Sequence, residues 1–297
     1  MKKTSRLLAI FFVLLLLDLS TYVRDVFSQS QKCFLWKAQS KTSNVYLLGS
    51  IHIFKKESFP LTRKIEDTFE HSDILVVEAN IADKEKIDLQ KLMEIAFYPE
   101  NDTLEKHVSK ETYELVKKNL EGLDISPELI NKQKPWSLAA TLSSIALLKL
   151  GYDPNFGIDM YFLSKTKGKK IIELESLDDQ LNLFSNLSDQ DQELFLLYTV
   201  KDLDILGKEV DRLINAWSSG DTKGLESIMT KSVNEDRRLS PIYEKLIYGR
   251  NRNMVSKIED LLKAKETYFV IVGAGHLVGD KGIIEILKGN GYSLEQL

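Results

Sequence analysis

Two histidines occur in the same short phrase at two distant places in the chain. Gly49-Ser50-Ile51-His52 and Gly273-Ala274-Gly275-His276 both read Gly-x-x-His, and each follows an apolar run. A third polar residue, Glu78, also follows such a run. Two imidazoles and one carboxylate are a common ligand set for zinc, manganese, cobalt or iron. His52, His276 and Glu78 are therefore candidate ligands of one divalent ion.

Other interpretations of these residues stay open. A histidine after a strand is often an ordinary loop residue, and Glu78 could simply cap the next segment. Gly273-x-Gly275 could belong to a dinucleotide-binding phrase, but the third glycine, Gly279, comes one residue late and few residues follow it. The backbone amides before the last helix could instead bind another anion. The recurrence of Gly-x-x-His favours the metal site.

A second polar cluster begins at Arg250-Asn251, on a predicted helix. One functional interpretation is that Arg250 points into the cleft and steadies a developing oxyanion. The alternative is a solvated helical face. Two further carboxylates are weaker candidates: Asp159 could cap a helix, and Glu175 could hold an imidazole in place. The remaining histidines, His71 and His107, look ordinary.

The candidate residues stand where strands end. Apolar runs at 44–49, 74–77 and 267–273 predict strands, and a helix after residue 58 would separate the first two. We expect the first two strands to be parallel and adjacent. In open α/β sheets, ligands bind beyond the carboxyl ends of the strands. The three candidate ligands would therefore meet at one edge.

The middle of the chain is mainly helical. Periodicity predicts helices near 103–121, 127–150, 157–167, 189–219 and 241–264, with a strand at 169–175. A helix at 281–288 and a last strand at 292–294 close the chain. We therefore predict an α/β domain with a mixed central sheet flanked by helices and a large helical insertion.

The composition excludes several classes of protein. The 297 residues carry 40 Lys and Arg against 44 Asp and Glu, a net charge of −4, and 43% are hydrophobic. Such a chain is not a disordered protein, and it has no basic excess for nucleic acid. Its single cysteine, Cys33, excludes a disulfide framework and any cysteine-based zinc site.

The first residues have the pattern of a targeting signal. Lys2, Lys3 and Arg6 precede the apolar run 7–17, which is too short to span a membrane. We predict that residues 1–28 are a signal peptide or an uncleaved N-terminal anchor, and that 29–297 form one domain. Either alternative places the domain outside the cytoplasm, in the periplasm, secreted, or held at the inner membrane.

An ordered set of phrases resembles the TraB/GumN/PrgY family of bacterial proteins, which is related to the Tiki proteases of animals. The phrases cover nearly all of the chain after the predicted signal peptide or anchor. They are 46–52, 76–78, Lys134-Pro135-Trp136-Ser137-Leu138-Ala139, Gly157-Ile158-Asp159, 174–180, Arg250-Asn251-Arg252-Asn253-Met254 and 272–279. Ser50 stands where the family usually has threonine, and Gly249 where an acidic residue often precedes the arginine.

The resemblance implies an erythromycin-esterase/ChaN-like fold and a metal-dependent hydrolase. It implies that His52, His276 and Glu78 build the site and that Arg250 and Asn251 belong to it. We therefore expect an extracytoplasmic metallopeptidase with a peptide or small-molecule substrate. Glu78 would ligate the ion or act as general base, and Arg250 would stabilise the tetrahedral intermediate. The alternative is a non-catalytic envelope protein that binds haem or a peptide in the same cleft.

Overall fold

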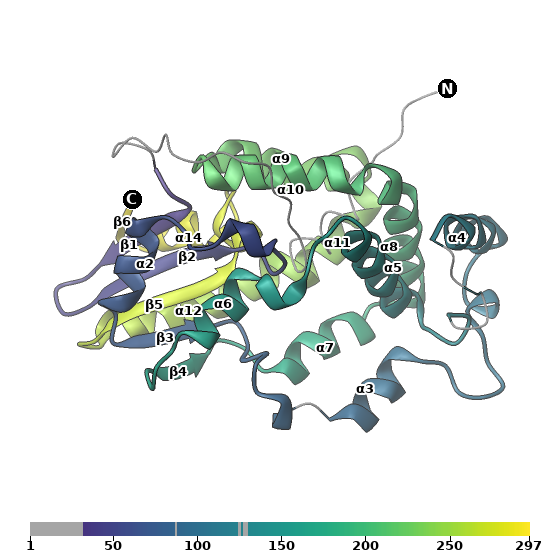
Figure 1. Cartoon of the computed structure of the whole chain (residues 1–297), viewed down its shortest axis with the longest axis horizontal. Helices are drawn as coiled ribbons and strands as arrows, with labels where there is room; N and C mark the ends of the chain where they lie inside the picture. The colour runs from purple at the N-terminus through teal and green to yellow at the C-terminus, as the bar shows by residue number, and fades with distance from the viewer. Residues whose placement is uncertain (1–31, 87, 124–125, 127–129) are drawn as a thin grey trace.

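A six-stranded mixed sheet organises the chain (Figure 1). The computed structural model describes residues 32–297 except 87, 124–125 and 127–129. The strand order is β4-β3-β5-β2-β1-β6, in which β4, β3, β5 and β2 are parallel and β1 and β6 are antiparallel to their neighbours. The strands are β1 (Leu35–Gln39), β2 (Asn44–Ser50), β3 (Ile74–Val77), β4 (Lys170–Glu173), β5 (Thr267–Gly273) and β6 (Ser293–Gln296). The predicted mixed α/β architecture is confirmed.

One pairing predicted from the sequence is wrong. β2 and β3 run parallel, but β5 lies between them and pairs with both. The reason is the apolar content of β5: every residue after Thr267 in this strand is buried. A parallel strand with two apolar faces is stable where neighbours and helices cover it on all sides. The sequence analysis also missed β1, which forms an antiparallel hairpin with β2.

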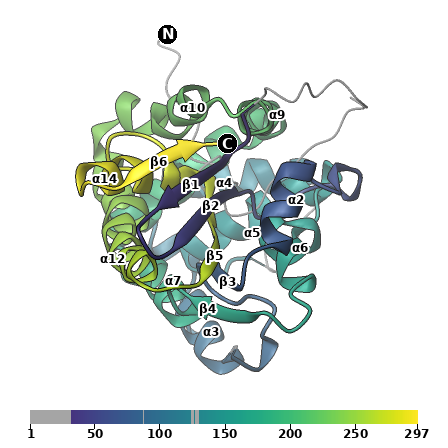
Figure 2. The ribbon, with the colours of Figure 1, turned by 90° about the vertical axis from the view of Figure 1, so that its left-hand side faces the viewer.

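Helices cover both faces of the sheet. Figure 2 shows α12 (Gly249–Lys263) and α14 (Ile283–Gly289) on one side, and α2 (Arg63–Glu70) and α6 (Ile158–Ser164) on the other. The helix α2 illustrates why: Ile65 and Phe69, four residues apart, are buried while most of its other side chains face water.

The helical insertions lie between β3 and β5, beyond one end of the sheet (Figure 1). They comprise α3 (Leu89–Ala96), α4 (Lys110–Leu123), α5 (Pro135–Lys149), α7 (Leu177–Ser185), α8 (Asp189–Asp202), α9 (Leu206–Ser218), α10 (Thr222–Glu235) and α11 (Ser240–Tyr243). A five-residue π-helical segment, η8 (Glu244–Tyr248), joins α11 to α12. Such segments often occur at functional sites.

Several helix boundaries differ from their predictions. The helix predicted at 127–150 begins at Pro135, because proline suits the first turn of a helix. The long helix predicted at 189–219 is divided into α8 and α9 by a short 3₁₀ turn, Leu203–Ile205. The helix α7 was not predicted. It begins at a capping box formed by Ser176 and Asp179.

In the part of the chain that the structure describes, none of the helices has both the length and the apolar character needed to cross a membrane. The predicted signal peptide or anchor at 1–28 lies outside the described residues.

Candidate active site

His52 follows β2 and is held by a carboxylate from α6. Its Nδ1 lies 2.5 Å from Oδ2 of Asp159. Because an ionised carboxylate can only accept, Nδ1 carries the proton and Nε2 is left facing the sheet edge. Burial opposes a charge on this ring, but the charge of Asp159 and its hydrogen bond outweigh burial and raise the pKa of His52. Asp159 therefore orients His52, whereas the N-cap of α6 is Gly157.

His276 lies in the short helix α13 (Ala274–Leu277), directly after β5, and is held by an amide. Its Nδ1 is 2.6 Å from Oδ1 of Asn251, whose Nδ2 donates to the carbonyl of Lys281 at 2.8 Å. The amide oxygen must therefore accept from the Nδ1–H of His276, which leaves a lone pair on Nε2. Burial, and then the charge of Arg250, lower the pKa of His276 to about 3.

Glu78 follows β3 and lies between the two histidine-bearing segments and α12. Its Oε1 accepts from the backbone N–H of Gly273 at 2.6 Å and lies 3.7 Å from Nε2 of His276. Its Oε2 accepts from Nη2 of Arg250 at 2.5 Å. Burial disfavours the carboxylate, but Arg250, then the histidines and the Gly273 amide, lower the pKa of Glu78 to about 2. Glu78 is therefore a buried anion.

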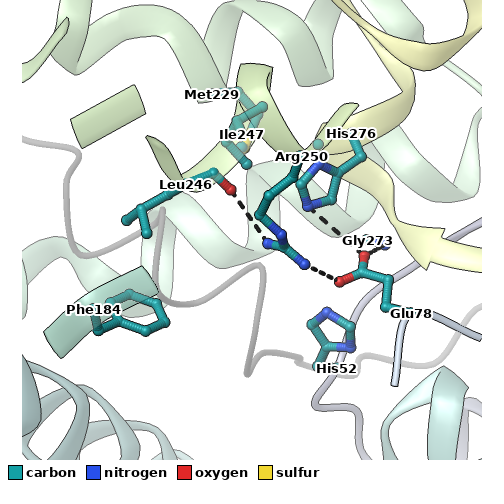
Figure 3. Close-up of a pocket in the computed structure, with 10 residues that line it drawn as sticks. His52, Glu78, Phe184, Met229, Leu246, Ile247, Arg250, Gly273 and His276 are labelled. Carbon is teal, nitrogen blue, oxygen red and sulfur yellow. Dashed lines mark hydrogen bonds and ion pairs between the residues drawn. The ribbon is translucent and has the colours of Figure 1, made fainter. Parts of the chain in front are cut away.

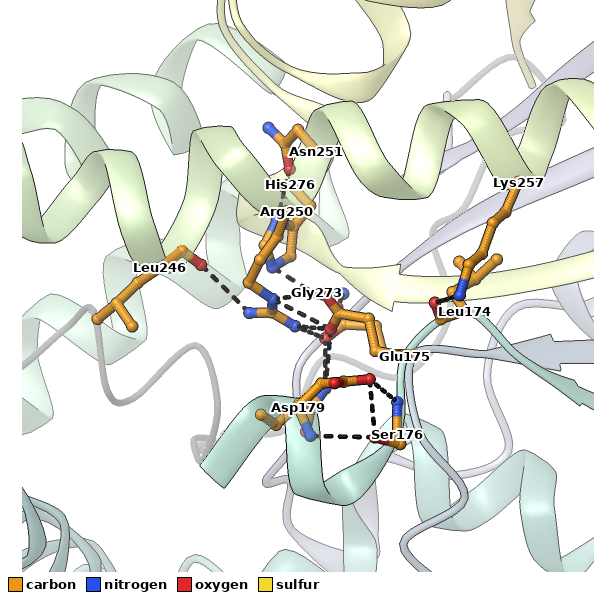
Figure 4. A network of polar contacts seen from close by, with 12 residues as sticks. Leu174, Glu175, Ser176, Asp179, Leu246, Arg250, Asn251, Lys257, Gly273 and His276 are labelled. Carbon is orange, nitrogen blue, oxygen red and sulfur yellow. Dashed lines mark hydrogen bonds and ion pairs between the residues drawn. The ribbon is translucent and has the colours of Figure 1, made fainter. Parts of the chain in front are cut away.

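Arg250 bridges two carboxylates (Figure 4). Besides Glu78, it contacts Glu175 through Nε at 3.0 Å and through Nη2 at 2.6 Å, and its Nη1 donates to the carbonyl of Leu246. Burial acts against the charge of Arg250, but the two carboxylates raise its pKa. The amide of Gln180 donates to both carboxylates, at 3.2 and 3.3 Å. All the polar groups of this cluster thus have partners.

These side chains line a small chamber (Figure 3). Its polar side consists of His52, Glu78, Arg250 and His276, and its volume is about 20 Å³, room for roughly one water molecule. The opposite wall is apolar and comes from α7, α10 and η8: Phe184, Met229, Leu246 and Ile247. Glu78, Arg250 and His276 are therefore buried at the wall of a space that holds little water.

The donor types at this point are those that bind divalent ions. A methyl group on Gly273 would lie 3.3 Å from Oε1 of Glu78, 3.5 Å from Nε2 of His52 and 3.4 Å from Cδ2 of His276, so all three candidates surround one point. Both imidazoles are fixed through Nδ1, as metal-ligating histidines usually are. Among the described residues, however, no three His, Cys, Asp or Glu side chains are grouped as a complete metal site. Glu78 is instead held by Arg250 and Gly273.

The structure brings all five predicted site residues together. They are His52, Glu78, Arg250, Asn251 and His276. The role suggested for Glu175 is wrong, because this carboxylate holds Arg250 and not an imidazole. The sequence analysis missed Gln180, although it ends one of the phrases that resemble the family. It also left the partner of Arg250 open, and that partner is a pair of carboxylates from other elements.

The chain matches one protein family and several known proteins over most of its length. Residues 34–296 match the TraB/PrgY/gumN family. "Uncharacterized protein YbaP" of Escherichia coli (strain K12) is 24% identical over 82% of this chain and 87% of its own length. "Metalloprotease TIKI homolog" of Amphimedon queenslandica is 24% identical over 90% of this chain, and "Metalloprotease TIKI2" of Danio rerio is 20% identical over 92%.

The chain spans 62% of the length of each of these two TIKI proteins. No solved structure matches the chain. The family match covers every residue of the chamber and nearly all of the described chain, and it shows that this protein belongs to the TraB/PrgY/gumN family.

Proposed function

We propose that the protein is a metal-dependent hydrolase that cleaves peptide bonds. One observation carries the proposal: His52, His276 and Glu78 surround a single point beside a buried arginine. The names of the TIKI relatives support a metalloprotease, although this chain is distant from them. His52, His276 and Glu78 would hold the ion, which could be zinc, manganese, cobalt or iron. When bound, such an ion lowers the pKa of water and polarises a carbonyl.

The residues of the chain fix the two imidazoles for this task. Asp159 keeps the proton of His52 on Nδ1, so the lone pair of Nε2 would be available to the ion. His276 stays neutral, because burial and the charge of Arg250 lower its pKa to about 3, and it presents the lone pair of its own Nε2 to the chamber. Both rings thus present a fixed lone pair to the same space.

Arg250 supplies fixed positive charge. The guanidinium is anchored by Glu78 and Glu175, so it needs little rearrangement when negative charge develops on a carbonyl oxygen nearby. The apolar wall formed by Phe184, Leu246 and their neighbours excludes water and strengthens this interaction. Glu78 in turn keeps the N–H of Gly273 and the guanidinium in place.

A second candidate mechanism uses the same residues without an ion. The short contact between His52 and Asp159 is the geometry of a general-base pair, and Arg250 already provides a cation in the chamber. In this case the protein would still hydrolyse peptides, but chelators would not inhibit it.

We also propose that the protein acts outside the cytoplasm. The support is the basic start at Lys2, Lys3 and Arg6, followed by the apolar run 7–17. Peptides are the proposed substrates. A cleaved and an uncleaved N-terminus both fit this location.

Metal analysis combined with peptide cleavage tests the proposal. We expect the purified protein to contain a divalent metal, to cleave peptides from a fluorogenic library, and to lose activity with a chelator. His52→Ala and His276→Ala should abolish cleavage, whereas His71→Ala, an exposed histidine at the end of α2, should not.

Other results would distinguish between the alternative mechanisms and functions. Cleavage that survives chelation but not His52→Ala supports the metal-free mechanism. Full activity of both chamber variants, in a protein without metal, would falsify the hydrolase site. Binding of haem or a peptide without turnover would favour the non-catalytic alternative.

A further inference from the structure

A polar cleft lies next to the chamber, between α7 and α12. It has a volume of about 670 Å³, which is within the usual range of ligand sites. Figure 4 shows its two walls and, at its floor, Leu174 and Glu175. The side chains that enter it from α12 include Arg250, Asn253 and Lys257.

The cleft and the chamber share a wall. Arg250 lines both spaces. On α7, Leu183 lines the cleft and its neighbour Phe184 lines the chamber. On η8, Lys245 lines the cleft and its neighbour Leu246 lines the chamber. Since the chamber has room for roughly one water, most of a substrate must lie outside it. The cleft is therefore placed to hold that part.

A second cleft, of about 660 Å³, also adjoins the chamber. The boundary there is formed by Met229, Ile247 and Gly275, and is largely apolar. The boundary with the α7–α12 cleft is the arginine itself. A carbonyl that must reach Arg250 therefore has a polar path from the α7–α12 cleft and not from the other.

The walls of the α7–α12 cleft carry hydrogen-bonding groups that the described part of the chain does not use. The amides of Asn182 and Asn253 and the hydroxyl of Ser256 line it and make no side-chain hydrogen bond to another described residue. An amide both donates and accepts, so these groups match the backbone of an extended peptide.

The charged side chains of the cleft differ in their interaction partners. Glu175 is bound to Arg250, and Asp179 accepts two hydrogen bonds from Ser176 in the capping box. Lys257 and Lys245, by contrast, donate hydrogen bonds to backbone carbonyls, those of Leu174 at 2.5 Å and Asn186 at 3.3 Å. Neither forms a direct ion pair with a carboxylate of the described chain, although the hydrogen bonds from Ser176 and then the charge of Lys257 lower the pKa of Asp179. The cleft can therefore accept an added anion.

The spacing along α12 gives a length scale. Arg250, Asn253 and Lys257 are separated by three and four residues, so they lie on one helical face. At 1.5 Å per residue, Lys257 lies about 10 Å along the helix from Arg250. An extended chain covers this distance with about three residues, at roughly 3.3 Å each.

We propose that the α7–α12 cleft binds an extended peptide and that Lys257 receives a carboxylate about three residues from the bond cleaved in the chamber. The carboxylate is the side chain of an acidic residue of the substrate. Lys257 is thus a specificity-determining residue. This inference rests on the proposed peptidase activity.

Pairs of peptides that differ only in one Glu or Gln test this role of Lys257. Internally quenched peptides carry a single Glu or Gln at each position around the cleaved bond, and the Glu/Gln ratio of kcat/KM is measured. We expect a preference of about tenfold for Glu about three residues from the bond, as for a hydrogen bond to a charged group. Lys257→Gln should remove this preference, and Lys257→Glu should transfer it to peptides with Lys at that position.

The control is Lys263→Gln on the same helix, an exposed lysine paired with Asp260 outside the cleft. It should keep the Glu/Gln ratio of the wild type. A preference that survives Lys257→Gln, or that is lost in Lys281→Gln at the second cleft, would overturn the inference.

Binding separates this inference from the proposed function. Fluorescein-labelled Glu and Gln peptides are titrated against the His52→Gln variant, with and without Lys257→Gln, and anisotropy is followed. If the wild type cleaves nothing but the Glu peptide binds through Lys257, the cleft is a peptide-binding site with Lys257 as its carboxylate receptor, and only the hydrolase proposal fails. If no peptide binds, the inference is wrong.

Discussion

The amide oxygen of Asn251 lies 2.6 Å from Nδ1 of His276, and this contact determines which nitrogen of the ring faces the chamber. The amide group cannot turn over, since its nitrogen donates to the carbonyl of Lys281. A fully buried asparagine on α12 thus fixes a histidine that follows β5.

The first prediction concerns this contact. Asn251→Leu removes the acceptor for His276 while keeping a similar volume, so the ring loses its orientation. We expect activity or metal affinity to fall by about 10- to 100-fold, as is typical when such a supporting partner is lost. The measurements are kcat and metal content. The control is Arg252→Ala, an exposed neighbour on α12, and equal activity of the two variants would contradict the assigned role.

Gly273→Ala tests whether activity needs the space beside Gly273, which His52, Glu78 and His276 surround. The backbone at Gly273 is compatible with alanine, but the added methyl group would lie within 3.5 Å of His52, Glu78 and His276. We expect activity to fall by more than about tenfold, with only a small change in Tm, because the methyl group occupies the place of a reacting or ligating atom.

The matched glycine variant is Gly157→Ala. Its methyl group would lie 2.2 Å from the carbonyl oxygen of His52, so the backbone must shift. This variant should lose stability as well as activity. A fully active Gly273→Ala protein would show that nothing needs the space beside Gly273.

The buried ion pairs give a third prediction. Arg250→Met leaves Glu78 and Glu175 buried without their cation, so the free energy of unfolding should fall by about 3–5 kcal/mol. Urea unfolding followed by circular dichroism measures this loss. Arg252→Met, which breaks an exposed pair with Glu244, should cost about 0–1 kcal/mol. A loss below roughly 1 kcal/mol for Arg250→Met would mean that Arg250 is not buried as described.

The stability of the protein should depend on pH through the two histidines, in opposite directions. His276 has a pKa lowered from 6.5 to about 3, so the unfolded chain binds its proton first and stability falls as the pH drops below 6.5. The pKa of His52 is raised above 6.5, so its contribution to stability is fully present below pH 6.5 and is lost as the pH rises through the raised pKa. Glu78, lowered from 4.5 to about 2, adds a further loss below pH 4.5.

Single variants separate these contributions. In urea unfolding on both sides of pH 6.5, His276→Gln should flatten the loss of stability below pH 6.5, and His52→Gln should flatten the loss of stability as the pH rises above 6.5. Identical slopes in the two variants would show that the two rings do not differ in protonation.

The sequence was informative where a polar residue directly follows an apolar strand. His52, Glu78 and His276 all stand at such positions, and strand ends at one edge of a parallel sheet converge. Arg250 and Asn251 were identifiable as a polar pair, and both are nearly or fully buried. The α/β class and the helical insertion also followed from the order of the predicted strands and helices.

The partners of these residues were not predictable in the same way. Glu175 meets Arg250 across 75 positions of sequence, and Asp159 meets His52 across 107. Nothing local in the sequence distinguishes such a carboxylate from a helix cap. The predicted strand order was wrong for a related reason. The strand β5 is far from β2 and β3 in sequence, and its place between them depends on burial of both of its faces.

The two Gly-x-x-His phrases are not equivalent in space. In the pairing of β2 with β5, Gly49 faces Val272 and Gly273 faces Ser50, so the phrases are offset by one residue. One histidine emerges in a loop against a carboxylate, and the other emerges in a helix against an amide. A one-residue offset between neighbouring strands thus gives the chamber two unlike sides: an imidazole held by a carboxylate on the α6 side, and an imidazole held by a neutral amide on the α12 side.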